Sequence, residues 1–317
     1  MMLRLAHIAI VSPGGCGLYE TTRELVAALR ARGVDSRICD PTGPKTGEDR
    51  GALFGDLDWA ESADLLVNHS GLGARLECAS VPVVHVMHGR PRNSFLLEMA
   101  GRTPIYSYHY HKSRDDRWKA LVTFWPQHVP YHRVMWPNTP IHYVQPPVDL
   151  ERWTPNGPSG YAWHGMGGRV NVVSTDAWRE DIDPFNAVNA FALAARNAPG
   201  WKLHIYGNSK NLRAWAPLLK RIQDDGNLGQ VVGWVTGLDN VYRAADLMIT
   251  AHTINTRAVR EAMACGCPVQ RINCDLRTAT ITLPGQDARR WFRVEAEESF
   301  DPAVTARQFE EICDGCL

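Results

Sequence analysis

Short apolar runs alternate with helical patterns through the first part of the chain. Runs rich in aliphatic and β-branched residues predict strands at residues 4–12, 35–39, 63–68, 82–87 and 103–108. Residues 19–33 instead repeat apolar side chains at helical spacing and end at Gly33, a residue type that commonly ends helices. Repetition of strand, helix and strand in this order predicts a parallel sheet covered by helices on both faces.

Residues 136–160 interrupt this alternation because they are rich in proline. Proline lacks a backbone N–H and blocks a helix, so the segment is predicted to connect two domains around one short strand, 141–145. The alternation then resumes, with predicted strands at 169–174, 201–207, 230–235, 246–250 and 268–272 and predicted helices at 183–198, 211–225, 238–245 and 256–266. We therefore expect two α/β domains, 1–155 and 156–300, and a C-terminal helix within 301–317 that packs back on the first domain.

The composition fits a folded two-domain protein and gives no sign of a general attraction to nucleic acid or membranes. The chain has 317 residues, of which 44% are hydrophobic and 21% are charged, as expected for a folded globular protein. Lys plus Arg and Asp plus Glu both total 34, so no net charge draws the chain to nucleic acid or membranes. No apolar run approaches the roughly 20 residues that span a bilayer, and the N-terminal run predicts a buried strand rather than a signal peptide. We expect a cytoplasmic protein.

The eight cysteines do not indicate a metal centre. A zinc ribbon needs two C-x2-C pairs, and that spacing occurs once, at Cys313 and Cys316. Cys265 and Cys267 are predicted to be small core residues, because a reduced state is the default for a chain with so few cysteines. We therefore expect no metal at the functional site.

Ligands of open parallel sheets bind beyond the carboxyl ends of the strands, so the loops that follow strands are the candidate sites. Gly14 and Gly15 lie in such a loop, between the first predicted strand and the first predicted helix. Glycine lets the backbone approach a ligand closely, and the helix that follows presents N–H groups to an anion. The loop matches neither the G-x-G-x-x-G nor the Walker spacing. An anion-binding loop and a plain strand-to-helix turn are therefore both open.

A second candidate loop precedes the predicted helix 256–266. Thr256, or Asn255 before it, can cap this helix, and the first helical N–H groups together with Arg257 can bind a diphosphate. Glu261 lies about one turn further on, where a carboxylate can accept both hydrogens of a ribose diol. These residues predict a nucleotide site at the start of this helix.

Residues 260–269, REAMACGCPV, resemble the EAMACG-PV signature of the retaining family-4 glycosyltransferases, which have the GT-B fold. Further similarity follows in the family's order through residues 13–33, 83–89, 141–155 and 231–250. The resemblance implies two Rossmann-like parallel-sheet domains that face a central cleft, the second binding a nucleotide-sugar and the first an acceptor. It also implies transfer of a hexosyl or pentosyl group from a UDP- or GDP-sugar to a hydroxyl, with retention and without a required metal or other cofactor.

The sequence departs from the resembled family at the donor site. The family usually carries Glu-x7-Glu, and Glu261 matches the second glutamate, but Thr253 stands at the first, which contacts the donor sugar in the family. The family's usual Arg and Lys after the first strand of the second domain are replaced by Ser174-Thr175 and Asp183-Pro184. We therefore expect Arg179 or Arg257 to stabilise the leaving diphosphate. Two alternatives stay open: a non-catalytic GT-B module that binds a nucleotide or a partner, and a sugar-nucleotide epimerase.

The resemblance also assigns roles to single residues. In the family, a histidine at the position of His88 lines the cleft near the reacting sugar, so His88 joins Arg257 as a candidate catalytic residue. A structural histidine at a strand end is the alternative. The candidate donor-binding residues are Gly14, Gly15, Arg179, Gly207, Thr253, Thr256, Arg257 and Glu261.

Residues 103–136 interleave aromatic and basic side chains. Aromatic faces with neighbouring cations suit stacked bases or sugars, and in the resembled family the first domain takes the acceptor. Tyr108, Arg114 and Arg117 are therefore candidate acceptor-binding residues, with a modified base in DNA or a glycan as the acceptor. An ordinary aromatic core with solvated charges is the alternative, since no nucleic-acid-binding motif accompanies the segment.

Overall fold

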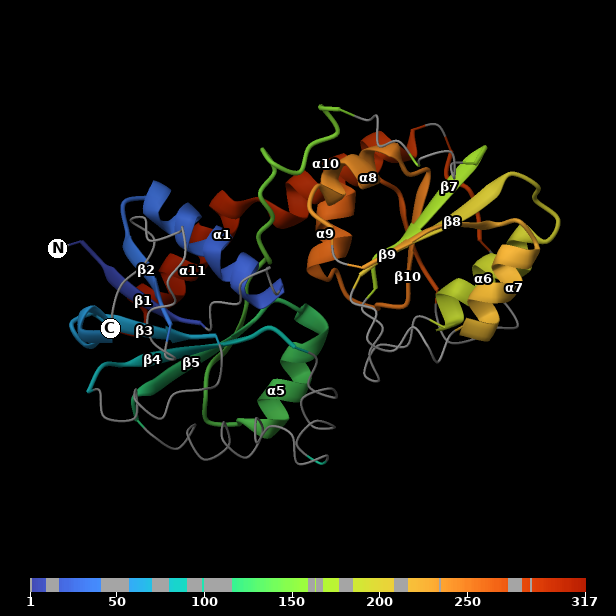
Figure 1. The fold of residues 1–317 in the computed structure, drawn as a ribbon. Coiled ribbons are helices and arrows are strands. Elements are labelled where there is room, and N and C mark those ends of the chain that lie inside the picture. The colour runs from blue at the N-terminus through green and yellow to red at the C-terminus, as the bar shows by residue number, and fades with distance from the viewer. Residues whose placement is uncertain are drawn as a thin grey trace. The chain divides into compact units, whose positions relative to one another are not determined.

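In the computed structural model the chain forms two compact units, each with its own parallel sheet (Figure 1). The N-terminal unit comprises Met1–Pro147 and Phe300–Leu317, and the C-terminal unit comprises Val148–Ser299. The structure describes residues 2–9, 17–40, 57–69, 80–89, 99, 116–158, 163, 168–176, 185–207, 216–233, 235–272, 281–285 and 287–317.

The sheet of the N-terminal unit has the strand order β2-β1-β3-β4-β5-β6, and its neighbouring strands are parallel. The strands are β1 (Arg4–Ile8), β2 (Asp35–Cys39), β3 (Leu65–Asn68), β4 (Val83–Met87), β5 (Trp118–Thr123) and β6 (Ile141–Tyr143). The helices are α1 (Gly17–Ala31), α2 (Leu57–Glu61), α5 (Val129–Met135) and α11 (Pro302–Asp314), with a 3-10 turn η2 over Pro126–His128. Strands β3 and β4 are buried along their whole length, as expected for inner strands of a covered parallel sheet.

The sheet of the C-terminal unit has the strand order β11-β10-β7-β8-β9, again with parallel neighbours. The strands are β7 (Val170–Ser174), β8 (Trp201–Tyr206), β9 (Leu228–Val232), β10 (Leu247–Thr250) and β11 (Val269–Arg271). The helices are α6 (Phe185–Ala195), α7 (Ala216–Asp224), α8 (Leu238–Ala244), α9 (Arg257–Ala264) and α10 (Ala288–Phe300). Phe191 of α6 is fully buried against Val172, Leu203 and Ile249, which form the middle of the sheet.

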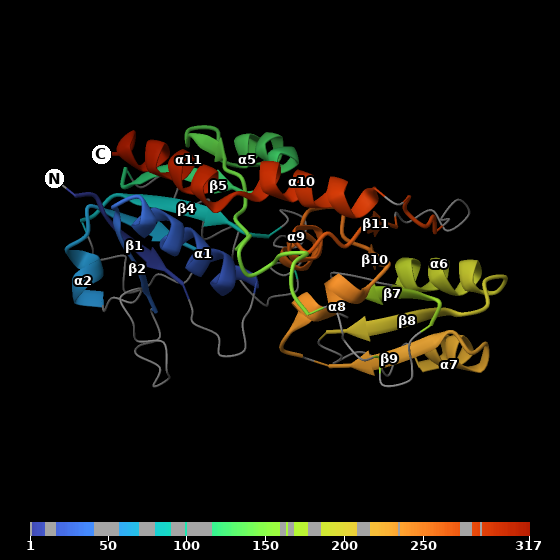
Figure 2. The same ribbon diagram turned by 90° about the horizontal axis from the view of Figure 1, so that it is seen from above.

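The strand order reverses once in each sheet, and this reversal decides which helices cover which face. Crossovers between parallel strands are right-handed, so helices that connect strands in opposite directions along the sheet lie on opposite faces. In the C-terminal sheet, α6 and α7 lead from β7 towards β9 and cover one face. Helices α8 and α9 lead back towards β11 and cover the other face (Figures 1 and 2). The reversal lies between β7 and β10 in the C-terminal unit and between β1 and β3 in the N-terminal unit. Ligands of such sheets bind at these two places.

The predicted two parallel-sheet units are confirmed, and most predicted elements appear within two or three residues of their expected bounds. Among the described residues, the elements that the sequence analysis missed are β5, α2, α5, α10 and the 3-10 turn η2. The predicted strand at 103–108 lies outside the described residues. In the part of the chain that the structure describes, no helix combines the length and the apolar character that crossing a membrane requires.

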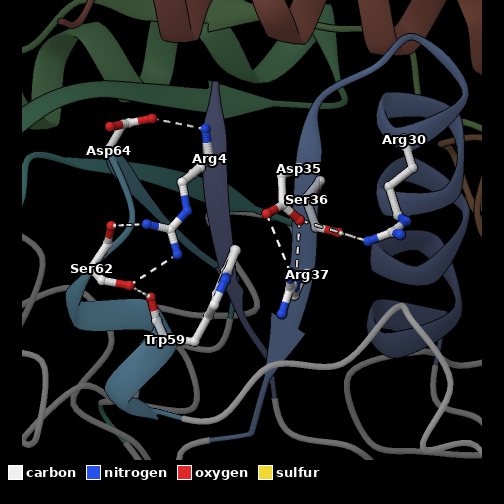
Figure 3. Close-up of polar contacts among 8 residues, drawn as sticks. All are labelled: Arg4, Arg30, Asp35, Ser36, Arg37, Trp59, Ser62 and Asp64. Atoms are coloured by element: carbon white, nitrogen blue, oxygen red, sulfur yellow. Dashed lines mark hydrogen bonds and ion pairs between the residues drawn. The ribbon is translucent and has the colours of Figure 1, made fainter. Parts of the chain in front are cut away.

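A cluster of side chains around Trp59 lies at the end of the N-terminal sheet where β1 and β3 begin (Figure 3). The backbone N–H of Arg4, the first residue of β1, donates to Asp64 at 2.8 Å, and the Arg4 guanidinium donates to the carbonyl of Ser62 at 2.8 Å. The guanidinium carbons of Arg4 and Arg37 lie 5.2 and 4.5 Å from the Trp59 ring centroid, within the range of cation–π attraction. The cluster fastens α2 to β1 and β2 at the edge opposite the strand carboxyl ends, and it therefore stabilises the fold rather than forming a ligand site.

Two arginines hold the first residues of the C-terminal unit against its helices. Arg243 of α8 is buried, and its Nη1 donates to the carbonyl of Thr154 at 3.0 Å. Arg293 of α10 donates from Nη1 to the carbonyls of Trp153 and Ala264, both at 2.8 Å. Because Ala264 is the last residue of α9, Arg293 joins the end of that helix to the incoming chain.

We expect Arg293→Met to lower the free energy of unfolding of the chain by about 2–3 kcal/mol, since it leaves carbonyls without a charged donor. Arg290→Met, on an exposed position of the same helix, is the control and should change stability by less than about 0.5 kcal/mol. Urea denaturation followed by circular dichroism measures both. Equal effects of the two variants would show that Arg293 does not hold this junction.

Candidate functional site

The carboxyl ends of β7 and β10 are held together by the carboxylate of Asp176. Its Oδ1 accepts a hydrogen bond from Thr250 Oγ1 at 2.6 Å, and its Oδ2 accepts one from the Ala251 N–H at 2.6 Å. His252 Nε2 lies 3.7 Å from Oδ1. Asp176 is 2% exposed, and a carboxylate so deeply buried is stable only when hydrogen bonds satisfy it. These contacts lock the loop after β7 to the loop after β10 at the point where the strand order reverses.

Gly207, a candidate donor-binding residue, packs against the same loop. Its φ is +147°, and a Cβ at this position would lie 3.2 Å from the carbonyl oxygen of Asp176. The Gly207 N–H donates to the carbonyl of Gly233 at 3.1 Å. A side chain here would therefore push the Asp176 loop away from the end of β8. The glycine permits a close backbone approach at the sheet edge.

Helix α9 begins just beyond this edge, and the hydroxyl at its N-cap is a polar group of interest. Thr256 occupies the N-cap position, as the sequence predicted, but its side chain makes no hydrogen bond to the helix. Among the described residues its Oγ1 is buried and has no hydrogen-bond partner, an arrangement that is uncommon in native proteins. The first N–H groups of a helix also lack partners inside the helix. Thr253, three residues earlier, is exposed.

Arg257 and Glu261, which the sequence assigned to a diphosphate and a ribose, form one ion pair within α9. Arg257 Nε lies 2.6 Å from Glu261 Oε1, and their side chains are 13% and 8% exposed. Tyr242 of the neighbouring helix α8 is fully buried and donates its O–H to Thr175 Oγ1 at 3.2 Å. Burial first, and then the charge of Glu261, raise the pKa of Tyr242 well above its usual value. Glu261 is therefore a buried, oriented carboxylate next to an aromatic ring and the β7 loop.

The cysteines near α9 are core residues. Cys265 and Cys267 are fully buried, and burial raises the pKa of each thiol to about 12. They remain protonated at neutral pH, and a protonated thiol is neither a nucleophile nor a metal ligand. Within the described residues, no three His, Cys, Asp or Glu side chains gather where a metal ion could bind.

In the N-terminal unit, His88 follows β4 and is half-buried. Its Nε2 lies 2.8 Å from Nδ1 of His69, which follows β3. The His88 ring also packs edge-on against Phe124, with centroids 5.1 Å apart, and its carbonyl accepts a hydrogen bond from Trp125 Nε1 at 3.3 Å. The candidate catalytic histidine is thus held on two sides by the ends of neighbouring strands.

The described part of the aromatic–basic segment, 116–136, contributes several rings to the core, whereas Tyr131 is exposed. Trp125 and Trp136 are 6% and 2% exposed, and His132 is fully buried. These rings are not available for stacking on bases. Arg117, a candidate acceptor-binding residue, is half-buried and lies just before β5.

Five candidate residues lie outside the described residues: Gly14, Gly15, Tyr108, Arg114 and Arg179. The structure brings Gly207, Thr256, Arg257 and Glu261 to the carboxyl side of the C-terminal sheet, whereas His88 and Arg117 belong to the N-terminal unit. The sequence interpretation missed two residues, Asp176 and His69. His69 directly follows the predicted strand 63–68, and Asp176 lies two residues after the predicted strand 169–174, so the parallel-sheet rule could have marked both.

We expect Asp176→Ala to lower the free energy of unfolding by about 2–4 kcal/mol, because it leaves the Ala251 N–H and the Thr250 hydroxyl without an acceptor. Thr250→Val removes one of these bonds and should cost about 1–2 kcal/mol. Thermal and urea unfolding of the two variants measure the difference. A cost for Asp176→Ala no larger than that for Thr250→Val would mean that the carboxylate does not tie the two loops.

Comparison with known proteins finds a family match over part of the chain and solved structures of the same fold. Residues 180–305 match the family described as "Glycosyl transferases group 1". HepE from Anabaena, solved with UDP-glucose, superimposes with a TM-score of 0.70 over 99% of this chain and 100% of its own, at 14% identity. A glycosyltransferase from Rickettsia africae superimposes with a TM-score of 0.66 over 99% of this chain and 98% of its own, at 12% identity. No curated protein sequence matches. The chain therefore has the GT-B fold of these glycosyltransferases, and its residues 180–305 match the group 1 glycosyltransferase family.

Proposed function

We propose that the protein is a retaining glycosyltransferase that moves a hexosyl or pentosyl group from a UDP-sugar or GDP-sugar to an acceptor hydroxyl. The buried Arg257–Glu261 pair on α9 is the observation that carries the proposal, because it presents one oriented carboxylate at the carboxyl edge of the C-terminal sheet. The family match over residues 180–305 includes this helix. The structures of HepE with UDP-glucose and with UDP favour a uridine nucleotide.

Glu261 binds the ribose diol of the donor in this proposal. A carboxylate accepts hydrogen bonds from two neighbouring hydroxyls most readily when its two oxygens are held in one orientation. The ion pair with Arg257 at 2.6 Å fixes the orientation of Glu261. Arg257 is therefore a positioning residue for Glu261 as well as a candidate for the diphosphate.

The diphosphate binds at the start of α9. The first N–H groups of a helix have no partner inside the helix, and these groups and the buried Thr256 hydroxyl are donors of the kind that phosphate oxygens accept. A guanidinium carries five N–H donors, so the bond from Arg257 to Glu261 is compatible with a second bond to a phosphate. Arg179, expected after β7, supplies further positive charge in this proposal. Binding of the diphosphate in this way needs only hydrogen-bond donors and positive charge, and no carboxylate near the anomeric carbon takes part in it.

The transfer step breaks the bond between the anomeric carbon and the donor phosphate oxygen, and it forms a bond from the same carbon to the acceptor oxygen. The acceptor proton moves to the leaving phosphate, so no protein base is needed. Stabilisation of the departing diphosphate by helix N–H groups and arginine is then the main contribution of the C-terminal unit to the rate.

The acceptor is a hydroxyl compound handled by the N-terminal unit, and we favour a glycan over DNA. Trp125 and Trp136 are core residues and cannot stack on bases, which leaves Tyr131 as the exposed aromatic ring in the described part of the aromatic–basic segment. The zero net charge supplies no general attraction to a polyanion. His88 contacts the sugar or acceptor in this proposal.

Thr253 favours a second candidate function, a non-catalytic module that binds a nucleotide. It is exposed and uncharged at the position where the resembled family places the acid that contacts the donor sugar. A site that keeps Glu261 but lacks this acid would bind the nucleotide while losing contact with the sugar.

Incubation of the protein with a panel of UDP- and GDP-sugars tests the function directly. We expect nucleotide release that depends on a glycan acceptor, and a product with the donor's anomeric configuration by NMR. Nucleotide binding without release would support the non-catalytic module, and conversion of the donor to its epimer would support an epimerase. Failure to bind any nucleotide by calorimetry would overturn the proposal. A DNA oligonucleotide in the acceptor panel tests the other acceptor class.

We expect Glu261→Gln to weaken UDP binding by about 1.5–3 kcal/mol, roughly tenfold to a hundredfold, because the amide cannot accept both ribose hydrogens. Glu297→Gln is the matched control, since Glu297 pairs with Arg293 at the same spacing and the same 2.6 Å distance on α10. Isothermal titration of the folded variants measures the affinities. Equal affinities of wild type and Glu261→Gln would remove Glu261 from the nucleotide site.

A further inference from the structure

Three histidines from neighbouring strands of the N-terminal unit form a hydrogen-bonded chain. His7 lies on β1, and His69 and His88 directly follow β3 and β4. His7 Nδ1 lies 2.9 Å from His69 Nε2, and His69 Nδ1 lies 2.8 Å from His88 Nε2. His7 and His69 are 0% and 4% exposed, whereas His88 is half-buried. The chain therefore runs from the core to the candidate catalytic histidine.

The inner rings of this chain are neutral. Burial lowers the pKa of His7 to about 3. Burial also lowers the pKa of His69 well below its usual value, and the neighbouring rings of His88, His7 and His85 lower it further. Each neutral imidazole carries one N–H, so His69 can donate to one neighbour and must accept from the other.

Only two proton arrangements satisfy both hydrogen bonds. In the outward arrangement, His7 Nδ1–H donates to His69, and His69 Nδ1–H donates to His88 Nε2, so the proton of His88 is on Nδ1. In the inward arrangement, His88 Nε2–H donates to His69, His69 Nε2–H donates to His7, and the proton of His7 is on Nε2. The two arrangements differ in what lies at the buried end of the chain.

The buried end selects the outward arrangement. His7 Nε2 is buried and has no hydrogen-bond partner in the part of the chain that the structure describes. The His7 ring also lies 6.0 Å from the ring of Phe309 on α11, an apolar neighbour that offers no acceptor for a ring N–H. A buried N–H without an acceptor carries the full cost of desolvation, whereas a lone pair without a donor is better tolerated. The inward arrangement places such an N–H at His7, and the outward arrangement avoids it.

We propose that His7 and His69 fix His88 as the tautomer with its proton on Nδ1, so that His88 acts as a hydrogen-bond donor to the sugar or the acceptor and not as a base through Nε2. This inference rests on the proposed function for the identity of what His88 contacts. His69 is a positioning residue, since it acts through His88 and does not touch a substrate. The chain also fixes the plane of the His88 ring, because its Nε2 must point at His69 Nδ1.

The tautomer of His88 can be measured without any substrate. Two-bond 1H–15N correlation spectra of the full chain, labelled with 15N-histidine at neutral pH, distinguish N–H on Nδ1 from N–H on Nε2, and the His88 signals are those lost in His88→Asn. We expect wild type to show the Nδ1–H form. His69→Leu should release His88 to a mixture of tautomers. His69→Asn should retain Nδ1–H, because the asparagine amide nitrogen sits where His69 Nδ1 donates.

His85→Asn is the matched control, since His85 is a buried histidine on β4 whose Nε2 lies 3.1 Å from Met87 Sδ and whose ring lies 5.5 Å from that of Trp118. It should leave the tautomer of His88 unchanged. An Nε2–H form of His88 in wild type, or the same tautomer in wild type and His69→Leu, would overturn the proposal whether or not the protein transfers sugars. If a donor is turned over, His69→Leu should lower kcat about tenfold at unchanged KM, and His69→Asn should restore most of it. Equal kcat in all variants would remove His88 donation from the reaction while leaving the glycosyltransferase assignment intact.

Discussion

Both candidate sites depend on one geometric constraint: parallel strands bring their carboxyl ends to the same sheet edge, and two loops diverge where the strand order reverses. In the C-terminal unit this place lies between β7 and β10, and the carboxylate of Asp176 spans it. In the N-terminal unit it lies between β1 and β3, where His7 and His69 meet. Polar groups that are far apart in the sequence are thus brought together at one edge of each sheet.

The two units satisfy their buried polar groups by different means. The C-terminal unit buries full charges and balances them, as in the pair of Arg257 with Glu261 and the hydrogen bonds of Asp176. The N-terminal unit buries neutral imidazoles in series. Removing one partner of a buried charge pair is costly because the remaining charge is left unpaired. In a row of neutral imidazoles, the hydrogen bonds depend instead on which ring nitrogen carries each proton. A charged donor on one unit and an uncharged hydroxyl on the other would match this division.

Local patterns in the sequence predicted the local elements well. Helix α9 was expected over 256–266 and spans Arg257–Ala264, because a cap, an apolar face and a terminating glycine all lie within one short segment. Strand β5 was missed because Trp118–Thr123 carries a lysine and lies inside a segment dominated by aromatic and basic residues. The contacts of Asp176 with Thr250 and of His7 with His69 join residues 74 and 62 positions apart, and no periodicity reports such a distance. The sequence could therefore mark the loops that form the sites but not the pairs within them.

The N-terminal unit is discontinuous, since Phe300–Leu317 completes it, whereas the C-terminal unit is one uninterrupted stretch. Helix α11 packs beside α1, joined to it by the ion pair of Arg32 with Glu310 at 2.8 Å, and places Phe309 against His7. During synthesis on the ribosome, the first 147 residues emerge early but must wait for α11 before their core is covered. We therefore expect the part of the chain that is made first to complete its core only after α11 has been made.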